Sequence, residues 1–128
     1  MTTATIDTSR VLGVIETLRE AAPRIRSVLV ARNDGLLLVQ TAAEGDATRM
    51  AAMASTAVSL NKRITSTMGA GELTETSIVG TEGLILLHAA GPRAVLAVIA
   101  ETKANIAMIN LKARLAAQTI AGEFGPVR

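Results

Sequence analysis

The chain has 128 residues, a formal net charge of +2 and 49% hydrophobic residues, which excludes a disordered protein and indicates one domain with its own core. It contains one Phe and neither Tyr nor Trp, so it lacks the aromatic platforms on which single-stranded nucleic acids stack. The low net charge and the scattered Lys and Arg residues also argue against nucleic acid as a partner.

The absence of cysteine excludes disulfides, a thiolate nucleophile and a cysteine metal site. The polar segment 1–9 has no apolar signal-peptide core. The longest apolar runs are far shorter than the roughly 20 residues that a membrane helix needs. We therefore expect a soluble, cytoplasmic protein without direct membrane insertion.

The first predicted helix contains residues 11–18, where apolar residues recur with helical spacing, and Pro23 ends the run. Two apolar runs, 28–32 and 36–40, then meet at Asn33-Asp34-Gly35. Asn and Asp tolerate left-handed backbone angles and glycine adopts them without Cβ strain, so this tripeptide predicts a tight antiparallel hairpin.

A long second helix is predicted over residues 47–68, with Asp46 as its N-cap. Three strand-like runs follow, at 73–79, 84–89 and 94–100, each bounded by glycine-containing turns. Because the hairpin lies between two helices, the order is neither that of a helical bundle nor that of an alternating parallel-sheet fold.

The last predicted helix covers residues 105–121, with Gly122 as its C-cap. The element order α-β-β-α-β-β-β-α therefore predicts an α+β fold with a five-stranded antiparallel sheet. The runs 36–39, 84–87 and 95–99 are apolar at consecutive positions, which is typical of strands covered on both faces. We expect helices on both sides of the sheet.

The strand predicted at 73–79 is mostly polar, which suits the edge of a sheet. Exposed edges are usually protected by Lys or Pro, and this segment contains neither. It is either an ordinary edge strand or a strand that pairs with its own copy across a two-fold axis.

The second helix has two contrasting faces. The apolar face comprises Met50, Met53, Ala54, Ala57, Leu60, Ile64 and Met68. The opposite face comprises Thr48, Ser55, Thr56, Ser59, Lys62, Arg63 and Ser66. Small hydroxyl residues let another backbone approach closely, so we favour a protein-contact surface over a merely solvated face. The methionines are predicted to fill the core rather than to form a binding patch.

The last helix also has two apolar stripes. The main one contains Ile106, Ile109, Ala113, Ala117 and Ile120 and is predicted to pack on the sheet. A second stripe, formed by Met108, Leu111 and Leu115, is predicted to pack on the first helix rather than to form a partner groove.

No set of residues in the sequence has the pattern of a catalytic, metal or cofactor site. His88 is the only histidine and lies in an apolar strand, which favours a structural role. It cannot form a usual zinc site alone, and no Gly-x-Ser-x-Gly elbow precedes it. The turn glycines match neither the Walker pattern nor the dinucleotide fingerprint. The carboxylates of Glu72, Glu75 and Glu82 near the third strand are commonplace turn residues.

Taken together, the hairpin, the long Ala/Met/Ser-rich helix, the three strands with glycine turns and the helix near Asn105 resemble the roadblock family. This family comprises the dynein light-chain roadblock-type domain and its bacterial relatives. The resemblance implies a sheet order of 2-1-5-4-3, with the second helix on one face and the other two helices on the opposite face. It leaves the apolar segment 36–40 at an edge, where a covering loop or a partner would explain it.

The resemblance further implies a homodimer formed through the third strand and the second helix, and a Ras-like small GTPase as partner in a bacterial signalling complex. The residues it points to as dimer contacts are Thr74, Thr76, Ile78, Ser59 and Lys62. Those it points to as GTPase contacts are Arg49, Thr56, Ser59 and Arg63.

We therefore expect one domain at residues 8–122 with flexible tails at 1–7 and 123–128, no cofactor and no enzymatic activity. The expected function is a homodimeric regulator or scaffold for a small GTPase. One alternative is a structural adaptor in a membrane-associated sensor-kinase complex, without direct GTPase regulation. A second alternative is a small-ligand sensor domain, which would require a cavity.

Overall fold

The computed structural model describes residues 6–41 and 45–124 of the chain. None of the helices in this part is both long and apolar enough to cross a membrane. The elements in chain order are α1 (Thr8–Ala21), β1 (Ile25–Arg32), β2 (Leu37–Gln40), α2 (Ala47–Thr67), β3 (Thr76–Val79), β4 (Leu84–Ala90), β5 (Ala94–Ala100) and α3 (Ile106–Glu123).

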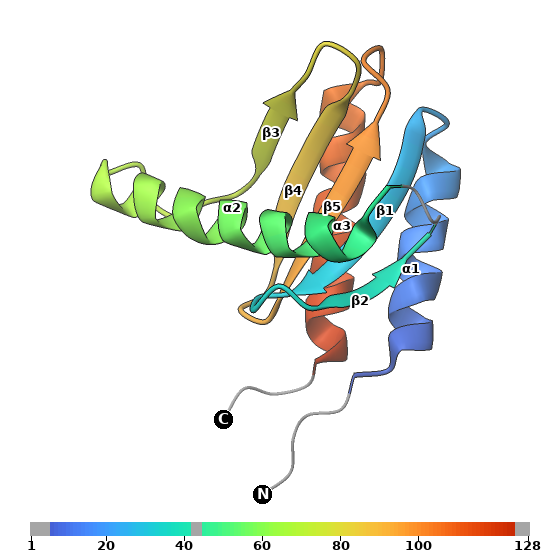
Figure 1. Ribbon diagram of the computed structural model, residues 1–128, viewed down its shortest axis with the longest axis horizontal. Coiled ribbons are helices and arrows are strands. Elements are labelled where there is room, and N and C mark those ends of the chain that lie inside the picture. Colours follow the sequence, from blue (N-terminus) through green and yellow to red (C-terminus); the bar gives the residue numbers. More distant parts are fainter. Residues whose placement is uncertain (1–5, 42–44, 125–128) are drawn as a thin grey trace, which may run out of the picture.

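All five strands form one sheet in the order β2-β1-β5-β4-β3, and every neighbouring pair is antiparallel. Helix α2 crosses one face of the sheet, while α1 and α3 lie side by side on the other (Figure 1). The predicted fold class, strand order and distribution of helices are therefore confirmed. Strand β5 is buried along its whole length because it lies in the centre of the sheet with helices on both sides.

Each helix begins at a capping residue whose side chain satisfies otherwise free backbone amides. The carboxylate of Asp7 accepts hydrogen bonds from the amides of Ser9 and Arg10. Asp46 caps α2 in the same way, as predicted, and Asn105 caps α3. These local bonds fix the point at which each helix starts and thus its register against the sheet.

The Asn33-Asp34-Gly35 hairpin forms as predicted. The Arg32 amide donates to the Leu36 carbonyl over 2.7 Å, and the Arg32 guanidinium pairs with the Asp34 carboxylate inside the turn. Gly35 adopts a φ of 98°, which side chains rarely tolerate, and an added Cβ would lie 3.3 Å from the Cα of Ala52 in α2. The hairpin is therefore locked both by its backbone angle and by its close contact with α2.

The ends of several elements differ from the prediction. The C-cap of α3 is Phe124 rather than Gly122, which lies within the helix. Phe124 is buried in the core and Asp7 caps α1, so the folded part extends beyond the predicted limits of 8 and 122. The remainder of the predicted tails, 1–5 and 125–128, lies outside the described residues.

The two edge strands also differ from expectation. Strand β3 begins at Thr76 rather than at residue 73. The residues before Thr76 do not join the sheet. Instead, Leu73 packs in the core under α2, and Glu75 pairs with Arg114 of α3 over 2.8 Å. Strand β2 is half-buried rather than fully buried, since it contacts α1 on one face and α2 on the other but lies at the end of the sheet.

Replacing Gly35 with Ala is expected to lower the free energy of unfolding by about 1–3 kcal/mol, because the positive φ and the contact with Ala52 both oppose a side chain. Urea denaturation measures this change. The matched control is Gly122→Ala in α3, where no atom lies within 4 Å of the added Cβ and φ is ordinary. That control should stabilise the helix by up to about 1 kcal/mol, and equal effects of both variants would contradict the expectation.

Candidate protein-contact surface

The free edge of β3 is the first part of the candidate site. The Gly80 amide donates to the Gly83 carbonyl over 2.9 Å at the β3–β4 turn. Because bonded and non-bonded pairs alternate along an antiparallel ladder, Thr76 and Ile78 bond to β4, whereas the amides and carbonyls of Ser77 and Val79 point away from the sheet. These outward groups could receive a further strand, and Ile78 and Val79 beside them are 46% and 72% exposed.

Helix α2 supplies the second part, and its orientation differs from the prediction. Its buried residues are small apart from one valine: Ala51, Ala54, Ser55 and Val58. The Ser55 hydroxyl donates to the Arg32 carbonyl over 2.7 Å, so a residue assigned to the contact face lies in the interior. Helix and sheet approach closely through these short side chains, which leaves no room between them for the larger apolar residues.

The large apolar residues of α2 consequently lie outside the core. They form an exposed apolar stripe consisting of Met53 (64% exposed), Leu60 (56%), Ile64 (44%) and Met68 (78%). The prediction that the methionines fill the core is wrong for Met53 and Met68. The sequence does contain a signal for the face that is buried. Helical spacing also relates Ala51, Ala54, Ser55 and Val58.

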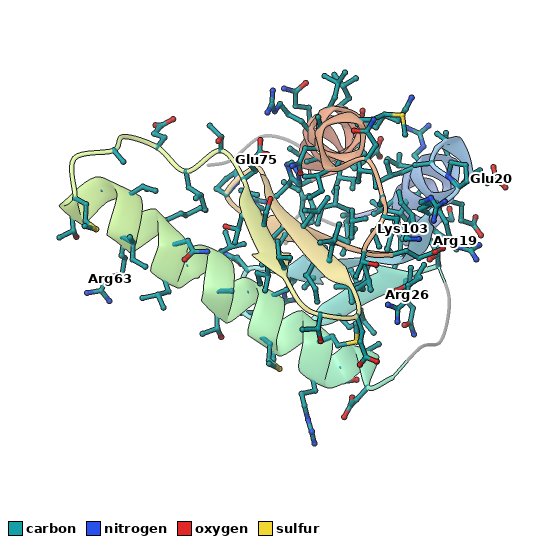
Figure 2. The ribbon with its side chains drawn as sticks, turned by 90° about the horizontal axis from the view of Figure 1, so that it is seen from above. Arg19, Glu20, Arg26, Arg63, Glu75 and Lys103 are labelled. Carbon is teal, nitrogen blue, oxygen red and sulfur yellow. The ribbon has the colours of Figure 1, made fainter. Side chains whose placement is uncertain are left out.

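The C-terminal half of α2 projects past the β3 edge of the sheet (Figures 1 and 2). The exposed apolar stripe continues along this projecting half at Leu60, Ile64 and Met68. The Asn61 side-chain amide donates to the Thr76 hydroxyl over 2.9 Å, which fastens α2 to the start of β3. An open strand edge and an uncovered apolar helix face are thus adjacent.

The predicted dimer contacts fall at different places on this surface. Thr76 and Ile78 lie on β3 and Thr74 precedes it, so all three flank the open edge. Ser59 and Lys62 are exposed, but helical periodicity places them on the side of α2 away from the exposed apolar stripe. The structure therefore brings the β3 residues together with the apolar stripe and separates both from Ser59 and Lys62.

The predicted GTPase contacts, in contrast, form one continuous line. Arg49, Thr56, Ser59 and Arg63 are all exposed and follow each other along the outer side of α2. Arg49 lies 3.7 Å from the capping carboxylate of Asp46. The Thr56 hydroxyl donates to the Ala52 carbonyl over 2.9 Å. Since Ala52 also lies on this line, the surface combines two cations with small side chains.

The structure also defines the surroundings of His88. Its Nε2 lies 2.8 Å from Asn110 Oδ1, so the Nε2–H tautomer donates this bond, and the ring is 2% exposed. His88 is therefore buried and hydrogen-bonded, as expected for a structural histidine. Within residues 6–41 and 45–124, no group of three or more His, Cys, Asp or Glu side chains could hold a metal ion.

Burial lowers the pKa of the His88 imidazole below its ordinary value of 6.5, and the positive charge of Arg114 lowers this pKa further. The hydrogen bond to Asn110 and the negative charge of Glu75 act in the opposite direction. Below pH 6.5 the unfolded chain therefore binds a proton that the folded chain does not. We expect the free energy of unfolding to fall, by up to about 1.4 kcal/mol per pH unit, as the pH decreases from 6.5 to the folded-state pKa. Urea titrations between pH 7.5 and 5 measure this slope.

The control for the pH effect is His88→Gln, which keeps a hydrogen-bonding side chain beside Asn110 but does not titrate. Its stability should change less over the same pH range than that of the original protein. Identical slopes for the two proteins would show that another group controls the acid sensitivity.

Comparison with known proteins identifies the family. The family model for the Roadblock/LC7 domain matches residues 14–100. The chain belongs to the Roadblock/LC7 domain family. Two uncharacterised proteins of Methanocaldococcus jannaschii are each 33% identical to it over 101 residues, which span 78% of this chain and 88% of each relative.

Solved structures share the same fold. A Roadblock/LC7 domain from Streptomyces avermitilis has a TM-score of 0.78 at 24% identity, covering 84% of this chain and 92% of that one. Myxococcus xanthus MglB has a TM-score of 0.82 at 17% identity, covering 94% and 92%. MglB from Thermus thermophilus, a gliding protein, has a TM-score of 0.80 at 17% identity, covering 89% and 87%. The predicted resemblance to the roadblock family is confirmed.

Proposed function

We propose that this Roadblock/LC7 domain protein is a non-enzymatic homodimer that binds a Ras-like small GTPase in the cytoplasm. The observation that carries the proposal is the adjacency of an open β3 edge and an exposed apolar stripe on α2. In a monomer both the β3 edge and the apolar stripe would be exposed to water. A two-fold contact would pair the edge with a second β3 strand and bury the stripe at the same time.

In the proposed dimer, two β3 strands pair edge to edge and extend the sheet across both subunits. The outward amides and carbonyls of Ser77 and Val79 supply the hydrogen bonds. The projecting half of α2 then lies against the partner, where Leu60 and Ile64 lose their exposed area. Full burial of a large apolar side chain contributes about 1.5–3 kcal/mol. Thr74, Thr76 and Ile78 lie at this contact, whereas Ser59 and Lys62, on the far side of α2, lie outside it in the proposed dimer.

The line formed by Arg49, Thr56, Ser59 and Arg63 is the proposed GTPase-binding surface. It lies on the outer side of α2 and therefore remains accessible beside the dimer contact. The family membership supports this assignment, as does the fold likeness to MglB. MglB has also been described in a tetrameric arrangement, and the proposal extends self-association of this kind to the present chain.

Binding to a purified Ras-like GTPase from the same organism, loaded with GDP or with a non-hydrolysable GTP analogue, tests the proposal. The double variant Arg49→Glu/Arg63→Glu should weaken binding by about tenfold or more, because it reverses both cations of the surface. Lys103→Glu is the matched control, since Figure 2 shows Lys103 and Arg63 on opposite sides of the molecule.

Failure to bind a Ras-like GTPase in either nucleotide state would contradict the proposal. Recovery of a sensor kinase or an adaptor in its place would favour the structural-adaptor alternative. A metabolite that raises the melting temperature would favour the ligand-sensor alternative.

A further inference from the structure

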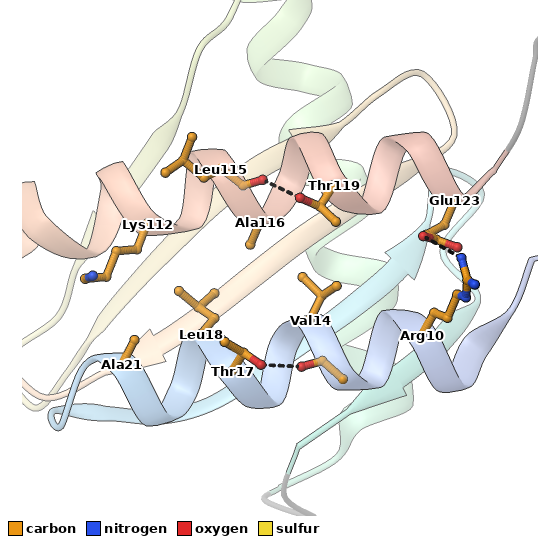
Figure 3. A pocket seen from close by; sticks show the side chains of 11 residues that line it. Arg10, Val14, Thr17, Leu18, Ala21, Lys112, Leu115, Ala116, Thr119 and Glu123 are labelled. Atoms are coloured by element: carbon orange, nitrogen blue, oxygen red, sulfur yellow. Dashed lines mark hydrogen bonds and ion pairs between the residues drawn. The ribbon is translucent and has the colours of Figure 1, made fainter.

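A groove runs between α1 and α3 on the face of the sheet opposite α2 (Figure 3). The groove is open to solvent and has a volume of about 710 Å³. Its α1 side consists of Arg10, Gly13, Val14, Thr17, Leu18 and Ala21. Its α3 side consists of Lys112, Leu115, Ala116, Thr119 and Glu123. Because it is long, open and bordered by two helices, its shape suits an elongated segment rather than a compact small molecule.

The lining is apolar where the two helices are closest. The hydroxyls of Thr17 and Thr119 are already used, since they donate to the carbonyls of Gly13 and Leu115 in their own helices. A Cβ built on Gly13 would have no atom within 4 Å, so the α1 wall is open at that point. Small residues at this position allow a further helix to approach closely.

An exposed ridge on α3 extends this apolar area. The ridge consists of Met108 (36% exposed), Leu111 (57%) and Leu115 (57%). These residues were predicted to pack on the first helix, and that prediction is wrong, because all three are exposed, whereas α1 and α3 share the core through buried residues such as Ile15 and Ala116. Leu115 borders the groove, so the ridge and the groove form one continuous apolar surface.

The two ends of the groove differ in charge. At one end Arg10 pairs with Glu123 over 3.8 Å, which neutralises both groups. At the other end Lys112 is half-buried, and it forms no ion pair with any residue in 6–41 or 45–124. A carboxylate on the occupant would complement this ammonium group.

We propose that the α1–α3 groove binds an amphipathic helix of a second protein. That helix presents apolar residues at positions i, i+3 or i+4, and i+7 to the groove and the α3 ridge, and it places an Asp or Glu against Lys112. The groove lies on the opposite face of the sheet from the proposed GTPase surface, so the two partners can bind together. The inference therefore goes beyond the proposed function and does not depend on it.

The helices of this chain do not fit the groove themselves, which favours a second protein over a second copy. Helix α2 has an exposed apolar stripe but no carboxylate within Ala47–Thr67. The α3 ridge lies beside Lys112 and Arg114, which would repel the Lys112 of another copy. Helix α1 carries exposed carboxylates at Glu16 and Glu20 but has no large exposed apolar residue.

Site-specific photocrosslinking of the full chain in its native cells identifies the occupant. A photoreactive residue replaces Thr17 or Leu115 at the groove, and Glu16 on the outer side of α1 serves as the control position. The expected result is a crosslink from the two groove positions only, to a segment with helical apolar spacing and an acidic residue. A crosslink to a second copy of this chain, to a segment without that pattern, or to no protein would overturn the proposal.

A synthetic peptide of the crosslinked segment then tests the charge contact. Lys112→Glu should weaken peptide binding by about tenfold, whereas Lys112→Arg and the control Lys103→Glu should leave it unchanged. Replacing the acidic residue of the peptide with Lys should restore binding to Lys112→Glu. Equal affinities of the original protein and Lys112→Glu for the original peptide would overturn the assignment of Lys112. Circular dichroism of Lys112→Glu should match that of the original protein, because the half-buried Lys112 lies at the rim of the groove and not in the core.

Discussion

Proline at position 77 should convert the proposed dimer into a monomer without unfolding the chain. The register of β3 against β4 places the Ser77 amide on the outer side of the strand. Proline has no amide hydrogen, and its ring would occupy the space of the incoming strand. Because the bonds to β4 are made by Thr76 and Ile78, the sheet within one subunit keeps its ladder. Sedimentation velocity should therefore show loss of the dimer at micromolar concentration.

The matched control for this experiment is Ser77→Ala. It removes the hydroxyl but retains the amide, so it should sediment as the original protein does. Circular dichroism of the proline variant should show the secondary structure of the original chain. An unchanged dimer in Ser77→Pro would place the subunit contact away from β3.

The second large effect is expected from Leu60→Glu/Ile64→Glu on α2. Both residues are exposed in a single subunit, so the fold should tolerate the change. In the proposed dimer, however, each glutamate would be buried without a positive partner, and the two subunits would bring four of them together. Burial of an unpaired carboxylate costs several kcal/mol, which exceeds the stabilisation from the edge hydrogen bonds. We expect a monomer that unfolds at nearly the same urea concentration whatever the protein concentration.

Ser66→Glu is the control for the α2 variant. It adds a carboxylate on the same helix, but helical periodicity places Ser66 away from the exposed apolar stripe. Its dimer should persist. Equal dissociation of both variants would indicate a general effect of charge on α2 rather than a contact through Leu60 and Ile64.

The fold could be predicted because its strongest signals are local. The Asn33-Asp34-Gly35 turn, the cap at Asp46 and the consecutive apolar run of β5 each act within a few residues. The hairpin between two helices and the three later strands then restrict the topology. At these positions the local conformational preference agrees with the overall fold, so the fold can be predicted from the sequence.

The orientation of α2 could not be predicted from hydrophobicity alone. Both the Met53–Met68 face and the Ala51–Val58 face have helical spacing, and the larger residues carry the stronger apolar signal. Close contact with the sheet selects the smaller residues instead, as the bond from Ser55 to the Arg32 carbonyl shows. In α3, likewise, the small residue Ala116 is buried in the core while the larger Leu111 and Leu115 remain exposed.

The candidate site shows the same limit. Thr76, Ile78, Arg49, Thr56 and Arg63 lie where a partner could reach them, although their roles remain predictions. The exposure of Leu60 and Ile64 was not predicted, because apolar residues on an amphipathic helix are ordinarily assigned to the core. When a helix has two apolar faces, only one of them packs on the sheet and the other remains available for a partner. Which face is buried can be decided only from the packed structure.

The most direct test is the mass of the complex formed with a Ras-like GTPase, measured by light scattering during size-exclusion chromatography. The free protein should elute with twice the 13.2 kDa mass of one chain. After addition of the GTPase loaded with a GTP analogue, the peak should contain two copies of this chain together with the GTPase. A monomeric protein whose elution and mass do not change when the GTPase is added would contradict the proposed function.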